Sequence, residues 1–154
     1  MVYLFVAAAA LIGFFIFQYF SKNNLHELAQ HYWPYVAGLL VKMSSKGKYD
    51  EAMNAFKLGK WEEAKKHLQT IDSDTSNYFL GIISYEQKDF QQAINSFKKV
   101  NSNSAYYSAS QFRMALVFIL EDKLLEATTT LTQLNSKNTV YSPQIKELLQ
   151  KLEE

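Results

Sequence analysis

Three side chains near the amino terminus, His26, Glu27 and His31, are the groups in this chain best suited to bind a metal ion. Imidazole and carboxylate groups are ordinary zinc ligands, and the chain has no cysteine to supply a thiolate. Histidines at this five-residue spacing point about 140° away from each other on a helix, so they do not share a face. Tyrosine and tryptophan close by are typical of a membrane-interface belt. We therefore predict packing or interface roles for this stretch and no metal site.

No catalytic set is present elsewhere in the sequence. It contains no phosphate-binding loop, nucleophile elbow or zinc-binding helix pair, and carboxylates such as Glu62 and Glu63 fall on expected solvent-facing helix sides. The net charge of +1 leaves no basic footprint for nucleic acid. We predict a non-enzymatic protein with no cofactor, no small-molecule substrate and no nucleic-acid partner.

Residues 1–20 form an unbroken apolar run without a charged side chain. Twenty helical residues span about 30 Å, the thickness of the bilayer hydrocarbon. Bulky Phe17, Tyr19 and Phe20 stand where a signal peptidase needs small residues, so a retained transmembrane signal anchor is favoured over a cleaved leader. Lys22 directly after the run favours a cytoplasmic soluble domain. We expect a single-pass protein of a bacterial inner membrane or an organelle membrane, in contact with lipid.

The remaining chain repeats a helical pattern. Five glycines and two prolines leave little material for hairpins, which favours an all-α domain. In three stretches a large apolar residue lies three positions before an alanine, and further apolar residues follow four and seven positions after it, which is one face of a helix. The large residues are Trp61, Phe90 and Leu124, and the alanines are Ala64, Ala93 and Ala127. Apolar stretches upstream of each predict a helix, a tight turn and a second helix per unit.

These units resemble the tetratricopeptide repeat (TPR), which has a leucine-glycine pair, a turn, an aromatic residue and spaced alanines. The second unit matches best, with Leu80, Gly81, Phe90, Ala93 and Phe97 in the expected places. The first unit departs in spacing, because Ala64 precedes Ala93 by about 29 residues rather than the family period of about 34. The resemblance implies an α-solenoid of stacked helix-turn-helix repeats.

The predicted organisation follows from this resemblance. We expect repeats at residues 45–73, 74–107 and 108–136, a juxtamembrane linker or capping helix at 21–44, and a carboxyl-terminal capping helix at 141–154. The sequence leaves open whether an additional degenerate repeat lies at residues 33–58. Small residues are expected where helices cross and large ones between neighbouring pairs. The repeat-packing set is Trp61, Ala64, Gly81, Phe90, Ala93, Phe97, Ala115, Leu124 and Ala127.

In this family the first helices of the units line a concave surface that binds an extended peptide or a helix. The register places these residues there: Tyr49, Met53, Phe56, Tyr78, Phe79, Ile82, Tyr85, Phe112, Arg113, Leu116 and Ile119. Such a face suits an apolar or amphipathic segment of a partner protein, although each residue could instead be core. Only Arg113 matches the clamp with which one variety of the repeat holds chaperone carboxyl termini.

We therefore predict a membrane-anchored adaptor or scaffold that mediates protein interaction and complex assembly. The alternative is a permanent accessory subunit of a membrane complex. In that case the anchor, which carries Gly13 and a run of alanines at 7–10, packs against other transmembrane helices.

Overall fold

The structure is a computed structural model that describes residues 22, 24–34, 47 and 49–153. The predicted anchor at residues 1–20 lies outside the described residues, as do residues 35–46. Within the described ranges, no helix combines the length and the apolar character needed to cross a membrane.

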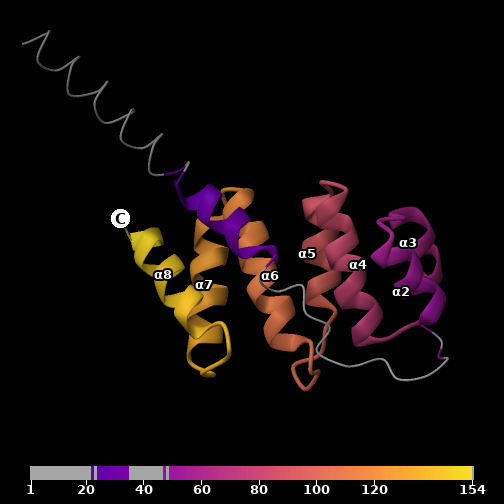
Figure 1. Ribbon diagram of the computed structural model, residues 1–154. Helices are drawn as coiled ribbons and strands as arrows, with labels where there is room; N and C mark the ends of the chain where they lie inside the picture. The colour runs from indigo at the N-terminus through magenta and orange to yellow at the C-terminus, as the bar shows by residue number, and fades with distance from the viewer. Residues whose placement is uncertain (1–21, 23, 35–46, 48, 154) are drawn as a thin grey trace, which may run out of the picture.

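The described residues form α-helices joined by turns, with no strand among them, which confirms the all-α class for this part of the chain. Residues 24–32 are helical. The helices that follow are α2 (Asp50–Lys57), α3 (Trp61–Gln69), α4 (Asp74–Glu86), α5 (Phe90–Lys98), α6 (Tyr107–Leu120), α7 (Leu124–Asn135) and α8 (Ser142–Glu153). Figure 1 shows them as a row that begins with α2 and α3 and ends with α8, each packing on its neighbours in sequence.

The turns inside three successive helix pairs have the same backbone structure. Gly59, Lys88 and Asp122 all have positive φ, at 67°, 63° and 57°. Each lies just after the end of the first helix of its pair, where a left-handed residue ends a helix in the Schellman motif. The next amides, of Lys60, Asp89 and Lys123, donate to the carbonyls of Ala55, Ser84 and Phe118 at 2.9, 2.8 and 2.9 Å. The repeat is therefore present in the backbone as well as in the side-chain pattern.

Small residues lie where the helices of a pair cross. Ala64, Ala93 and Ala127 have no exposed surface. A methyl group added at Gly81 on α4 would lie 2.4 Å from the ring of Phe97 on α5. This distance is far inside van der Waals contact, so glycine is required for α4 to approach α5 this closely.

The large residue at the start of the second helix of each pair was expected to fill the space between neighbouring pairs, but it packs within its own pair or is exposed. Trp61 packs edge-on against Phe56 at 5.4 Å, and Phe90 lies against Tyr85 at 5.5 Å, each time on a ring five residues earlier in its own pair. Leu124 is 43% exposed and does not fill the space between neighbouring pairs. Its pair has Ile119 in place of an aromatic residue five positions earlier.

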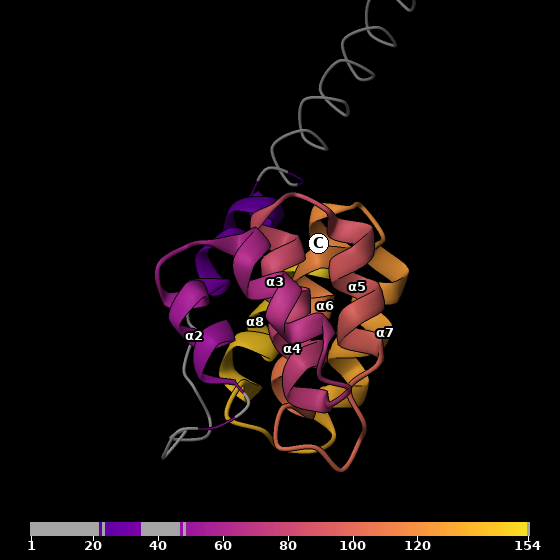
Figure 2. The same cartoon turned by 90° about the vertical axis from the view of Figure 1, so that its right-hand side faces the viewer.

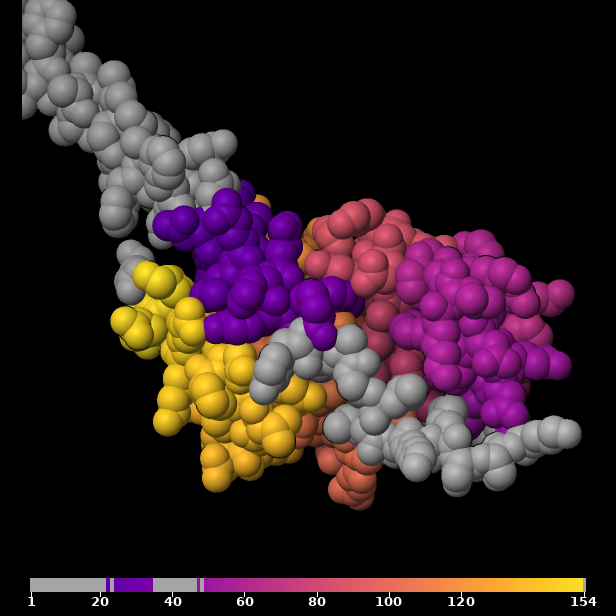
Figure 3. All heavy atoms as spheres, viewed as in Figure 1, coloured from indigo at the N-terminus to yellow at the C-terminus, as the bar shows by residue number. Residues whose placement is uncertain are grey.

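The helix of residues 24–32 lies at the far end of the row from α2. Figures 1 and 2 show it beside the end of the row that α8 occupies, and Figure 3 shows its surface in contact with that of α8. Leu25, Ala29 and Trp33 recur every four residues and are all buried, while Leu28 and Tyr32 pack against the same core. This spacing places one apolar stripe against the rest of the domain.

Candidate protein-binding site

Polar contacts fasten the amino-terminal segment, residues 22–34, to the α6–α7 turn and to α8. Lys22 Nζ lies 2.6 Å and His26 Nε2 3.0 Å from the two carboxylate oxygens of Asp122. The hydrogen bond from Lys22 holds the pKa of Asp122 below its ordinary value, although partial burial opposes the shift. Tyr32 donates to Glu147, and its pKa rises to about 12 because of burial and this hydrogen bond. Polar residues beside the apolar stripe thus contact two acidic side chains, Asp122 and Glu147.

Trp33 is the last residue of this stripe and lies against aromatic side chains of two helices. Its indole stacks on Tyr85 of α4, with the ring centroids 3.4 Å apart, and packs edge-on to Phe97 of α5. Its Nε1 donates to Glu86 Oε1 at 3.0 Å. With 7% of its surface exposed, Trp33 contributes to the core even though it comes from outside the repeated helix pairs.

Arg113 of α6 lies directly beneath this indole. Its guanidinium carbon is 4.2 Å from the centre of the Trp33 ring, and its Nε donates to the hydroxyl of Tyr78 at 3.3 Å. The residue is 1% exposed, and its Nη1 has no hydrogen-bond partner. Burial lowers the pKa of Arg113, while interactions with Tyr78, Tyr141 and Glu86 oppose that shift.

A cavity of about 280 Å³ opens next to Trp33 and Arg113. One wall comes from the amino-terminal segment, and the others come from α2, α4, α6 and the start of α3. Its lining is Trp33, Pro34, Phe56, Trp61, Tyr78, Phe79, Ile82, Glu86 and Arg113. Apolar and aromatic side chains with a few polar groups are the usual composition of a binding cavity. The volume is just below that of most small-molecule sites and suits one or two side chains.

The eleven predicted groove residues divide into two groups. Those that line the cavity are Phe56, Tyr78, Phe79, Ile82 and Arg113. The other six do not: Tyr49, Met53, Tyr85, Phe112, Leu116 and Ile119. Nine of the eleven are buried, and only Tyr49 and Phe56 are partly exposed. The set therefore does not form an open groove along the whole row.

The six residues outside the cavity have packing roles instead. Phe112 stacks on Tyr141 with ring centroids 4.8 Å apart and has no exposed surface. The hydroxyl of Tyr49 bonds to Ser73 Oγ at 2.6 Å, next to the cap of α4. Tyr85 is covered by Trp33. Trp33 of the amino-terminal segment and Tyr141, just before α8, thus cover two of the residues that were predicted to face an open groove.

Sequence reasoning missed the contribution of the amino-terminal segment to the site. Trp33 and Pro34 were placed in a linker, Glu86 had no assigned role, and Trp61 was assigned to repeat packing alone. The signal that points to docking is the four-residue spacing of Leu25 and Ala29 with Trp33, which predicts a helix with one buried stripe.

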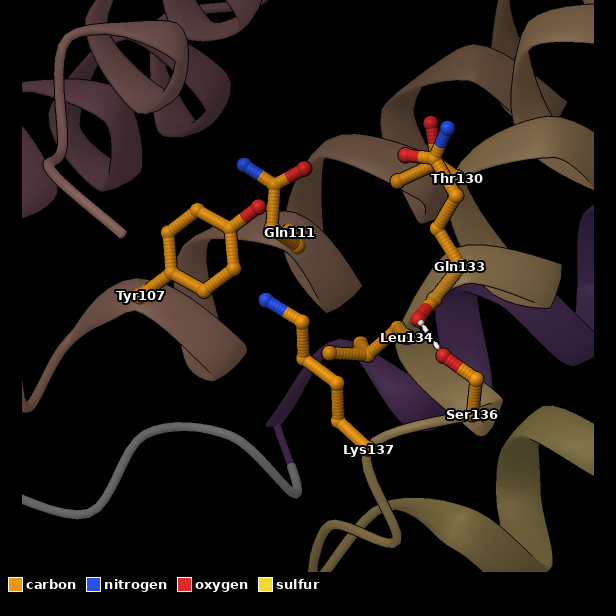
Figure 4. Close-up of a pocket in the computed structure, with 7 residues that line it drawn as sticks. All are labelled: Tyr107, Gln111, Thr130, Gln133, Leu134, Ser136 and Lys137. Carbon is orange, nitrogen blue, oxygen red and sulfur yellow. Dashed lines mark hydrogen bonds between the residues drawn. The ribbon is translucent and has the colours of Figure 1, made fainter. Parts of the chain in front are cut away.

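A second, more polar hollow of about 250 Å³ lies between α6 and α7 and is shown in Figure 4. Lys137 Nζ lies 4.4 Å from the centre of the Tyr107 ring, and Ser136 Oγ donates to the Gln133 carbonyl at 2.8 Å. Its other lining residues are Gln111, Thr130 and Leu134. None of the predicted groove residues lies there, and its lining holds no acid–base pair.

The two amino-terminal histidines do not come together in the structure. His26 faces Asp122, whereas His31 is exposed beside the ring of Tyr32. In the described part of the chain, no three histidine, aspartate or glutamate side chains are grouped so that they could hold a metal ion.

Comparison of the chain with protein-family models, with curated proteins and with solved structures gave no match.

Proposed function

We propose that this protein is a membrane-anchored, non-catalytic adaptor of the TPR type that binds a segment of a partner protein. Residues 1–20 anchor the chain and contact lipid, and the helical domain recruits the partner on the cytoplasmic side. The apolar run and Lys22 in the sequence support the anchor and its orientation. The matching turns and buried alanines of three helix pairs support the TPR assignment.

The observation that carries the binding function is the aromatic cavity beside Trp33. Phe56 and Phe79 face each other edge-on at 5.1 Å, and Trp61 lies against Phe56. Phe56 and Trp61 are only partly buried, so they combine large apolar surface with access from outside. Buried aromatic anchors of this kind dominate the energetics of protein interfaces.

The test compares the proteins that co-purify with full-length chains after extraction in a gentle detergent. We expect a soluble partner to be bound by the wild type and lost from the double variant Phe56→Ala, Trp61→Ala. Leu125→Ala is the control, because Leu125 is 78% exposed on α7 and lines no part of the cavity. The same set of partners on all three chains would contradict the proposal.

The second candidate is a permanent subunit of a membrane complex, which the run of alanines at 7–10 and Gly13 favours because small residues let transmembrane helices pack closely. A native gel of the same extracts separates the two. A subunit migrates in one large complex of fixed stoichiometry with other membrane proteins, and replacement of residues 1–20 by an unrelated transmembrane helix detaches it. An adaptor keeps its soluble partner after that replacement.

A further inference from the structure

A cation, Arg113, forms part of the cavity wall. Arg113 forms no ion pair with any described residue, and its Nη1 is buried without a hydrogen-bond partner. Glu86 is the described carboxylate that acts electrostatically on it, and this residue is exposed and accepts the hydrogen bond of Trp33 Nε1. The faces of Trp33 and Tyr78 are the main favourable surroundings of the guanidinium.

A buried, incompletely paired cation is costly, because removal from water is offset only when a charge and hydrogen-bond acceptors replace the lost solvation. The stacked rings and the Tyr78 hydroxyl offset part of that cost. The remaining donor, Nη1, still needs an acceptor. Because Arg113 also lines the cavity, an acceptor brought by a ligand can complete the set.

We propose that the cavity receives an acidic side chain of a partner segment, glutamate or aspartate, whose carboxylate pairs with the Arg113 guanidinium. A neighbouring aromatic or aliphatic side chain of the same segment packs against Phe56 and Phe79. Entry of the carboxylate shifts the Trp33 indole, which now covers the guanidinium. This inference rests on the proposed function and adds to it the chemistry by which the partner is recognised.

The dimensions favour a side-chain carboxylate over the carboxyl terminus of a partner. The volume of about 280 Å³ accommodates side chains, whereas a terminal carboxylate is attached directly to the main chain, which would have to enter as well. A carboxylate at the end of a flexible side chain can reach a nitrogen that has no exposed surface. Among the described residues, no cationic or amide side chain other than Arg113 lines the cavity to hold a terminal carboxylate.

The test uses the two tryptophans of the chain, Trp33 and Trp61, because both line the cavity and report on it by fluorescence. Three probes are added to the full-length chain in a nonionic detergent. The first is an acetylated, amidated pentapeptide of the sequence alanine-glutamate-phenylalanine-leucine-alanine. The second has glutamine in place of glutamate, and the third has glutamine and a free carboxyl terminus.

We expect the glutamate peptide to bind about tenfold more tightly than the glutamine peptide, since a charge-assisted hydrogen bond replaces a neutral one. The preference should disappear in Arg113→Met. This variant is expected to fold with an unchanged or higher melting temperature, because it replaces an unpaired buried cation by an apolar side chain. In Glu86→Gln, which removes a competing negative charge at an exposed position, the preference should increase.

Equal affinity of the glutamate and glutamine peptides, or a preference that survives in Arg113→Met, would overturn this inference and leave the proposed function intact. Stronger binding of the free-carboxyl peptide than of the glutamate peptide would overturn the assignment to a side chain. No fluorescence change with any of the three at millimolar concentration would contradict the proposed function itself. If Arg113→Met does not fold, the Glu86→Gln result decides, and an unchanged preference there counts against the pairing.

Discussion

The two ends of the row of helices present similar apolar surface but use it differently. At the α6–α8 end, the helix of residues 24–32 docks on the α6–α7 turn and on α8, and Trp33 after it packs on α4 and α5. At the α2–α4 end, Phe56 and Trp61 stay partly exposed beside a cavity. An aromatic face on the first helices of the pairs is therefore not by itself a binding site. Among the described residues, Phe56 and Trp61 beside the cavity stay partly exposed, although Trp33 and Pro34 form one of its walls, and this is the part that we propose for a partner.

The largest expected effect comes from removing the ring of Trp33, which packs the amino-terminal segment onto the helices. Trp33→Ala removes a ring that stacks on Tyr85 and covers Arg113, and we expect a loss of about 3 kcal/mol in the free energy of unfolding. Urea denaturation followed by circular dichroism measures it. His31→Ala, on the exposed side of the same helix, is the control and should change little. Equal stability of the two variants would show that the segment is not held by Trp33.

A second substitution tests the boundary between the two ends, where α4 lies on α5. Gly81→Ala places a methyl group against the Phe97 ring and should destabilise the domain by about 1–3 kcal/mol through overpacking. Without that clash the change would stabilise by about 1 kcal/mol, because alanine favours a helix over glycine. The sign of the change in melting temperature therefore decides. The double variant Gly81→Ala, Phe97→Leu should recover part of the loss, and complete independence of the two changes would refute the contact.

At the open end the same kind of truncation should affect stability less than at Trp33. Phe56 is half-buried, so Phe56→Ala should lower the free energy of unfolding by about 1–2 kcal/mol. The same denaturation series as for Trp33 gives the comparison. A loss as large as that of Trp33→Ala would place Phe56 in the core and remove the distinction between a covered and an open end.

The positive φ angles in the turns predict which substitutions there stabilise the fold and which destabilise it. Lys88 is exposed and has a φ of 63°, a conformation that costs an ordinary residue about 1 kcal/mol and glycine much less. Lys88→Gly should therefore raise the melting temperature, whereas Gly59→Ala at the matching turn should lower it. A fall in both would indicate that the two turns are not equivalent.

The smallest expected effect on stability is that of the Asp122 contacts, which hold the amino-terminal segment to the α6–α7 turn. Lys22 and His26 hold the pKa of Asp122 below its unfolded value near about 3.9, so this contact stabilises above that pH. The contribution is lost as the pH falls through the lower pKa of the folded state. Asp122→Asn should cost less than about 1 kcal/mol at pH 7, because the pair is exposed. The stability gap between variant and wild type should close at acidic pH, and a gap independent of pH would exclude this origin.

The repeating part of the fold could be predicted because it follows local rules. The alanine spacing located α3, α5 and α7, and the small residues at Gly81 and Ala93 indicated the helix crossings. Leu124 was predicted to fill the space between helix pairs because its sequence pattern matches that of Trp61 and Phe90. In the structure, Trp61 and Phe90 each pack on an aromatic residue five positions earlier in the sequence, whereas Leu124 has Ile119 there and is 43% exposed. The turns at Lys88 and Asp122 carry no glycine, so residue type alone did not mark them.

The site could be predicted only in part, because it depends on a long-range contact. Phe56, Phe79 and Ile82, which the repeat register predicts on one concave surface, line one cavity. The docking of Trp33 on Tyr85 joins residues 52 positions apart and has no local signature. Phe112 is covered by Tyr141, which lies outside the three repeated pairs, so the repeat pattern does not describe this contact.

The most direct test of the account is site-specific photo-crosslinking in the native membrane, with benzoylphenylalanine introduced at Phe56, Tyr32 or Leu125 of the full-length chain. These positions represent the open end, the covered end and an exposed site on α7. We predict a discrete adduct with another protein from position 56 and none from positions 32 and 125. Adducts of equal yield from all three positions, or from position 32 alone, would contradict the claim that the open cavity is where the partner binds.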